Sequence, residues 1–127
     1  MRVGRAALEA ILKGNVAEIT FLRRTPGPSD IRRMLCTLDM RLLNSNEGRV
    51  ALNFRPAQHP APYNPKAYNL LVVWDIFMQD YRAISMDNCQ LVQAIKSTPP
   101  DDFWAFFNNT LSKMTPEQKI RFMQNIK

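Results

Sequence analysis

The sequence predicts an α+β fold: a small antiparallel β-barrel or strongly bent sheet, with one helix before it and helices after it. Stretches of strand length occupy the middle of the chain, and apolar residues at helical spacing lie near both ends. Turns that contain proline or glycine separate these stretches. With 127 residues and a 46% hydrophobic composition, the chain is long enough for one domain with its own core.

The first third of the chain indicates a helix followed by a hairpin. Apolar residues recur at helical spacing in residues 5–13. Residues 16–24 alternate between two faces, as a strand does, and residues 31–38 form a second strand. The turn signal between them, TPGPSD, predicts a hairpin whose loop centres near Pro28.

The middle of the chain is less regular. Residues 39–43 fit a helical turn, residues 44–48 a loop, and residues 49–55 a short strand with weak alternation. Residues 55–66 carry four prolines and predict an extended, irregular segment. The run LLVVWDIF at residues 70–77 is apolar on both faces and predicts a central strand.

The remaining elements predict a division of the chain near residue 98. A returning strand is expected at residues 81–86, and a short helix capped by Asp87 is expected up to about Lys96. The Pro-Pro pair that follows marks a boundary. We therefore expect a domain over residues 1–98 and a helical extension over residues 99–127.

The positive charge of the chain is unevenly distributed. The net charge is +6, and residues 1–66 hold 11 Lys and Arg against 5 Asp and Glu, whereas residues 67–127 hold 6 against 6. The predicted hairpin sets Arg24 opposite Arg32 and Arg23 opposite Arg33. Because like charges across a ladder are unfavourable, we expect a polyanion to neutralise these arginines.

Arginine and aromatic side chains together predict a site for single-stranded nucleic acid. Arginine forks suit phosphate oxygens, and exposed rings stack on unpaired bases. The alternative interpretation is an ordinary solvated basic face, with Phe54 in the core. The candidate nucleic-acid-binding residues are Arg23, Arg24, Arg32, Arg33, Arg41, Arg49, Arg55, Tyr63, Lys66 and Tyr68.

The C-terminal extension predicts two helices. Residues 101–113 place several rings along one helical face, and Thr115 followed by Pro116 is a typical start of a last helix. The rings either pack on the rest of the domain or form a dimer or partner-protein surface. The residues of this candidate surface are Phe103, Trp104, Phe106 and Phe107.

Other classes of function find little support in the sequence. His59 has no neighbouring nucleophile, Asp101 and Asp102 fit the charge of a helix start, and no glycine cluster could cradle a phosphate. Two distant cysteines and one histidine indicate no metal site, and no apolar run reaches the ~20 residues of a membrane span. We therefore expect a non-enzymatic, cofactor-free cytoplasmic protein.

Two stretches carry a resemblance to a known family. RRMLCTLD at residues 32–39, followed by NPKAYNLLVVWDIFMQDYRAISMDNCQLV at residues 64–92, resembles the WYL-like, Sm-like β-barrel family of bacteriophage and bacterial proteins. The aromatic-arginine pair Tyr81-Arg82 belongs to this pattern, and Lys66-Ala-Tyr68 is an insertion into it. The resemblance covers about residues 19–92 and implies a small barrel of nucleic-acid-binding type.

The overall character of the chain is also similar to the single-stranded DNA-binding RNA polymerase cofactors of N4-related bacteriophages. We therefore predict a sequence-tolerant single-stranded DNA-binding protein that assists bacteriophage transcription or replication, with a homodimer favoured by the aromatic extension. One alternative is a protein-interaction module or inhibitor that acts on a polymerase, or on another nucleic-acid enzyme, through its aromatic C-terminal helices. A barrel that senses a small ligand is a further alternative.

Overall fold

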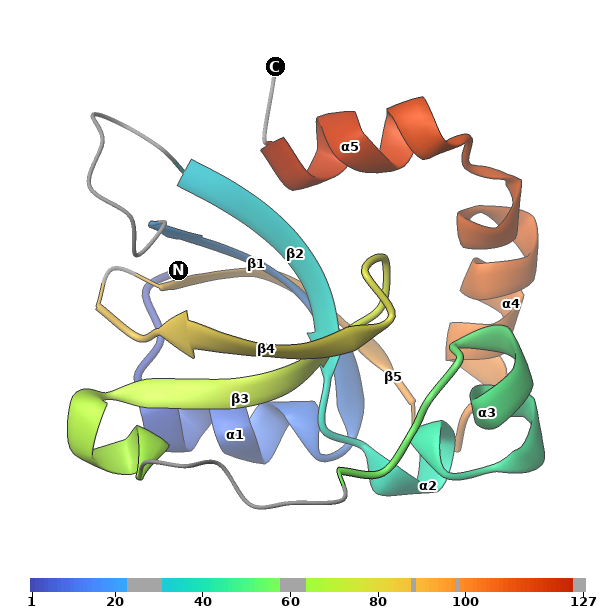
Figure 1. Cartoon of the computed structure of the whole chain (residues 1–127). Coiled ribbons are helices and arrows are strands. Elements are labelled where there is room, and N and C mark those ends of the chain that lie inside the picture. The colour runs from blue at the N-terminus through green and yellow to red at the C-terminus, as the bar shows by residue number, and fades with distance from the viewer. Residues whose placement is uncertain (23–30, 58–63, 88, 98, 125–127) are drawn as a thin grey trace.

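A five-stranded antiparallel sheet forms the centre of the molecule (Figure 1). The computed structural model describes residues 1–22, 31–57, 64–87, 89–97 and 99–124. The strands are β1 (Asn15–Leu22), β2 (Ile31–Thr37), β3 (Leu70–Asp75), β4 (Asp80–Ser85) and β5 (Gln90–Lys96), in the order β4-β3-β2-β1-β5. No pairing joins β4 to β5 in this part of the chain, so the sheet is bent but open. The α+β class and its bent-sheet form are confirmed.

Helices lie before the sheet, within its long connection and after it. They are α1 (Arg5–Leu12), α2 (Met40–Leu43), α3 (Asn46–Ala51), the 3-10 turn η1 (Pro65–Tyr68), α4 (Asp101–Asn109), the 3-10 turn η2 (Leu111–Lys113) and α5 (Pro116–Gln124). The predicted helix before the sheet and helices after it are therefore present. In Figure 1, α1 lies along one side of the sheet, and α5 lies above the sheet on the side where β2 begins.

The bend arises where β2 meets β3. β1 and β2 pair along their whole length, but β2 pairs with β3 only through Cys36↔Asp75 and Thr37↔Trp74. The backbone of Ile76 adds one further hydrogen bond to the Leu35 carbonyl, at 2.9 Å. The earlier residues of β2 do not pair with β3, and the inner side of the bent sheet opens there toward α5 (Figure 1).

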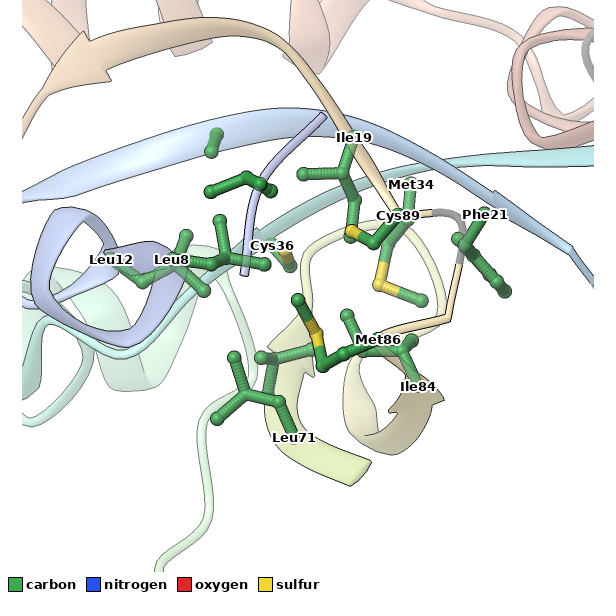
Figure 2. Packing of buried hydrophobic residues seen from close by; sticks show 13 residues of the cluster. Leu8, Leu12, Ile19, Phe21, Met34, Cys36, Leu71, Ile84, Met86 and Cys89 are labelled. Atoms are coloured by element: carbon green, nitrogen blue, oxygen red, sulfur yellow. The ribbon is translucent and has the colours of Figure 1, made fainter. Parts of the chain in front are cut away.

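The first core fills the inner side of the bend, against α1. Leu8 and Leu12 of α1 are fully buried there, and Figure 2 shows them beside side chains from all five strands or their ends. Cys36 and Cys89 belong to this core. Burial raises the pKa of the Cys36 thiol, and it raises the pKa of Cys89 to about 11, so both thiols stay protonated.

The second core lies on the outer face of the sheet. Trp74 of β3 is its largest buried side chain, and the helices α2, α3 and α4 cover it. Phe103 of α4 and Leu111 of η2 are buried in this core. The predicted boundary near residue 98 coincides with the end of β5, and the helices beyond it share a core with the sheet.

The sequence prediction for residues 44–55 is wrong, because α3 stands where a loop and a strand were expected. The Ser45 hydroxyl caps α3 by accepting the Gly48 N–H at 3.0 Å. Gly48 also allows α2 and α3 to touch, since a Cβ at this position would lie 2.1 Å from the Leu42 carbonyl oxygen. This close packing, rather than the weak alternation, determines the local structure.

The prediction of a helix up to Lys96 is also wrong, because residues 90–96 form the edge strand β5. The partner of Glu18 is Gln93, but the partner of Ile19 is Leu91, so Val92 is an extra residue in the strand. Such a bulge breaks the two-residue period that identifies a strand in a sequence. The apolar residues of this segment therefore have the spacing of a helix.

The chain's first residues run beside the outer edge of β5. The Met1 ammonium group donates to the Leu91 carbonyl at 3.0 Å, and the Val3 N–H donates to the Cys89 carbonyl at 3.1 Å. One edge of the sheet is therefore partly covered. The outer edge of β4, at the other end of the sheet, pairs with no strand among the described residues.

Candidate nucleic-acid interface

A groove of about 360 Å³ lies under α5, at the open mouth of the bent sheet. Phe21 and Met34, which belong to the first core, form the apolar floor of this groove. We call this cavity the α5 groove. Its lining residues are Phe21, Arg32, Arg33, Met34, Asp75, Arg82, Ile120, Met123 and Gln124.

The helix that covers this groove starts at a capping box. The Gln118 N–H donates to the Thr115 hydroxyl at 3.1 Å, and the Thr115 N–H donates to the Gln118 side-chain oxygen at 2.9 Å. The predicted helix start at Thr115 and Pro116 is therefore confirmed. α5 contributes no fully buried residue, so a few contacts at its surface hold it against the sheet.

Arg33 provides two of those contacts, and the Phe77 ring provides another with Phe122. The Arg33 Nε donates to the Phe122 carbonyl at 3.0 Å, and the Arg33 guanidinium carbon lies 4.3 Å from the centre of the Phe122 ring. Arg33 also lies 3.5 Å from the carboxylate of Glu18, which is 7% exposed. Because these internal groups occupy Arg33, we assign it to the anchoring of α5 and not to phosphate binding.

The predicted facing of arginine pairs is wrong. Leu22 pairs with Ile31, which sets Arg32 opposite Phe21 and Arg33 opposite Thr20. The observed register therefore differs by three residues from the expected one. Arg23 and Arg24 lie outside the described residues. Repulsion between facing arginines is therefore no argument for a polyanion ligand.

Asp75 is the carboxyl group that lines the α5 groove among the described residues. It is 2% exposed, its Oδ1 accepts the N–H groups of Phe77 and Met78 at 3.0 Å each, and its Oδ2 lies 3.8 Å from Arg82. Burial raises the pKa of Asp75, although the Met78 N–H, the positive charge of Arg82 and the Phe77 N–H oppose this effect. Among the described residues, the groove thus presents the guanidinium groups of Arg32 and Arg82 together with one carboxyl group, Asp75, whose pKa is raised by burial.

A second cavity, of about 410 Å³, lies on the outer face of the β3–β4 hairpin. The rings of Trp74 and Tyr81 meet edge to face there, with centroids 5.0 Å apart, and Phe54 lies 5.1 Å from Trp74. We call this cavity the Tyr81 pocket. Its lining residues are Arg55, Pro56, Ala57, Trp74, Asp80 and Tyr81. Phe54 itself is 5% exposed and belongs to the core, in line with the alternative interpretation above.

The structure does not bring all the predicted basic residues together. Arg41 and Arg49 are exposed on α2 and α3, and Arg49 contacts the side-chain oxygen of Asn44. Lys66 and Tyr68 are exposed on η1. α2 and η1 lie at the opposite end of the molecule from α5 in Figure 1. Tyr63 lies outside the described residues.

Asp75, Tyr81 and Arg82 are among the lining residues of these cavities that were not predicted as site residues. The sequence marks Tyr81 and Arg82 only as an aromatic-arginine pair. Strand alternation within β4 would have placed them on opposite faces of the sheet. Nothing in the sequence shows that the face of β4 that carries Arg82 meets Arg32 under α5.

The aromatic residues of α4 pack mainly within the molecule. Phe103 is fully buried in the second core, so it is not part of an exposed partner surface. Trp104, Phe106 and Phe107 are half-buried against the same core, with Trp104 and Phe107 in edge-to-face contact at 5.5 Å. A partner or dimer surface on α4 stays a prediction that concerns only these three rings.

Comparisons of this chain with protein-family models, with curated proteins and with solved structures found no match. The WYL-like, Sm-like resemblance therefore stays a prediction. Among the described residues, no three His, Cys, Asp or Glu side chains are grouped as metal ligands. No helix in the same residues is long and apolar enough to span a membrane.

Proposed function

We propose that this chain is a non-catalytic module that binds single-stranded nucleic acid without marked sequence preference. The observation that carries this proposal is the α5 groove, where Arg32 of β2 and Arg82 of β4 line one cavity. Guanidinium groups form charge-assisted, often bidentate hydrogen bonds with phosphate oxygens. A net charge of +6 also favours the approach of a polyanion.

The Tyr81 pocket supports a single strand over a duplex. A ring that lines an open cavity can stack on a base only when that base is unpaired. Tyr81 is half-buried and lines this pocket, and Arg82 is the next residue of β4. DNA is favoured over RNA, and a role in bacteriophage transcription or replication is favoured, only through the resemblance described above.

The proposal predicts that removing the two groove arginines weakens binding of a fluorescent dT oligonucleotide. The double variant Arg32→Gln, Arg82→Gln should bind about 10- to 100-fold more weakly at ~50 mM salt, because two charge-assisted contacts are lost. The salt dependence of log K should also become shallower by about 0.7 for each lost phosphate contact. Fluorescence anisotropy across a salt series measures both effects.

Arg41→Gln is the matched control for this experiment. It removes the same charge from an exposed position on α2, at the other end of the molecule. It should change the affinity by less than about twofold, as expected of a distant, screened charge. Absence of binding by the unmodified protein, or equal affinities for the double variant and Arg41→Gln when both remain folded by circular dichroism, would overturn the proposal.

A further inference from the structure

The edge strand β4 separates two cavities of different character. Tyr81 pairs with Trp74 and Arg82 pairs with Val73, so the side chains of Tyr81 and Arg82 point to opposite faces of the sheet. Arg82 lines the α5 groove, and Tyr81 lines the pocket named after it. The outer edge of β4 pairs with no strand among the described residues, so a ligand can pass around it.

We infer that the Tyr81 pocket binds one nucleobase of the same strand whose phosphates contact the α5 groove. This inference rests on the proposed function and adds a base-binding site to it. Adjacent residues of a strand are only about 3.3 Å apart along its axis, so both contacts fit within a few consecutive nucleotides that cross the β4 edge. The sequence alone did not predict a base-binding site at Tyr81.

The chemistry of the pocket suits a planar, partly polar ligand. Its walls are the rings of Trp74 and Tyr81 with Pro56 and Ala57, and its volume of about 410 Å³ lies within the range of small-ligand sites. Two charged side chains, Arg55 and Asp80, also line it. A guanidinium group donates hydrogen bonds and a carboxylate accepts them, and the Watson–Crick edge of every base carries both an acceptor and an N–H donor.

The position of Arg55 is also compatible with base binding. One of its Nη atoms lies 3.4 Å from the Gln79 carbonyl, which holds the side chain over the end of the β3–β4 hairpin. A guanidinium plane held beside an aromatic pocket can stack on a base as well as donate to it. Arg55 is therefore assigned to the base, whereas Arg32 and Arg82 are assigned to phosphates.

Trp74 provides a direct readout of this site. The chain has two tryptophans, so the variant Trp104→Phe leaves Trp74 as the single indole. A base that enters the pocket should quench its fluorescence. In this background we compare a dT oligonucleotide with an abasic strand of the same length, which has the phosphates but no bases. We expect both strands to bind, and only the dT strand to quench.

Substitutions at position 81 separate stacking from packing. Tyr81→Leu keeps an apolar side chain against Trp74 but removes the ring, so binding of dT should weaken about 5- to 100-fold, as expected for one lost stacking contact. Tyr81→Phe keeps the ring and should bind dT like the parent. Neither substitution should alter the affinity for the abasic strand.

The outcomes distinguish this inference from the proposed function. If neither strand binds, the proposed function fails and the inference fails with it. If both strands bind but dT gives no quenching, or if Tyr81→Leu binds dT as tightly as Tyr81→Phe does, the base site is wrong and the phosphate groove stands. Circular dichroism confirms that each variant is folded.

Discussion

Asp75 sets the charge of the α5 groove at the scale of a single residue. Its carboxyl group is buried beside Arg82, and burial raises its pKa. A carboxyl whose folded-state pKa is raised stabilises the fold below its unfolded-state pKa, and this contribution is lost as pH rises through the folded-state pKa. Ionisation of Asp75 therefore costs stability and reduces the positive charge near Arg32 and Arg82.

We expect Asp75→Asn to be at least as stable as the parent at pH 7 and to bind a dT oligonucleotide more tightly. The amide oxygen can still accept the Phe77 and Met78 N–H groups, while the negative charge is removed. The gain in affinity should be about two- to fivefold, the effect of removing one negative charge beside the partly exposed Arg82. Thermal melts at pH 4.5 and pH 7, with anisotropy titrations, measure both effects.

Asp102→Asn is the control for this substitution, because Asp102 is exposed at the start of α4. The loss of stability between acidic and neutral pH should be smaller in Asp75→Asn than in Asp102→Asn or the parent. Identical pH profiles for the two variants would show that Asp75 does not titrate as its burial requires.

The register of the first hairpin shows what the sequence could not predict at this scale. The position of the proline-containing turn suggested a loop centred near Pro28. The observed register instead aligns Ile19 with Met34, and both side chains are buried in the first core. Register follows the burial of one face, and a shift by an odd number of residues would turn that face outward. The core therefore determines which residues face Arg32 and Arg33.

At the scale of elements, the helices that are determined by a local cap or by apolar spacing were predictable. α1 and α5 follow from apolar spacing and from the Thr115 cap, which are local properties. β5 and α3 were not predictable, because a bulge at Val92 and the contact of Gly48 with α2 depend on partners distant in sequence or on tight packing. The α5 groove likewise combines β1, β2, β3, β4 and α5, and the Tyr81 pocket combines β3 and β4 with residues 55–57.

The two C-terminal helices should contribute very differently to stability. Phe103 is fully buried in the second core, so Phe103→Ala should lower the free energy of unfolding by about 3–5 kcal/mol. Removal of residues 115–127 deletes α5, which has no fully buried residue among those described, and should cost less. Urea denaturation measures both changes.

The matched comparison for Phe103→Ala is Phe107→Ala, since Phe107 is a half-buried ring on the same helix. It should cost clearly less than Phe103→Ala. If the α5 deletion unfolds the protein, or if the two phenylalanine variants are equally destabilised, this view of the C-terminal helices is incorrect.

At the scale of the whole molecule, the fold class was predictable but the placement of charge was not. The order of apolar stretches is sufficient for an α+β chain with helices at both ends of a bent sheet. The basic half of the sequence does not become one basic surface, because α2 and η1, which carry Arg41 and Lys66, lie at the opposite end of the molecule from α5 in Figure 1. Arg32 is near the start of β2 and α2 follows its end, so β2 itself lies between Arg32 and Arg41.

The short contact between β2 and β3 also divides the backbone into two groups of strands. β1, β2 and β5 share long ladders, as do β3 and β4, but only two residue pairs join the groups. Side chains of the two cores, Leu71 of the first core among them, therefore provide most of the connection. Amide hydrogens in the two groups should exchange with solvent as separate cooperative units.

Leu71→Ala should accelerate amide exchange in β3 and β4 by about tenfold or more, because it removes a buried side chain that links this hairpin to α1 and β1. Exchange in β1, β2 and β5 should change less. Hydrogen–deuterium exchange with mass spectrometry resolves the two groups by peptide, and uniform acceleration would indicate one unit. If exchange accelerates only in β3 and β4, the hairpin that carries Tyr81 and Arg82 opens independently of the three strands beside it.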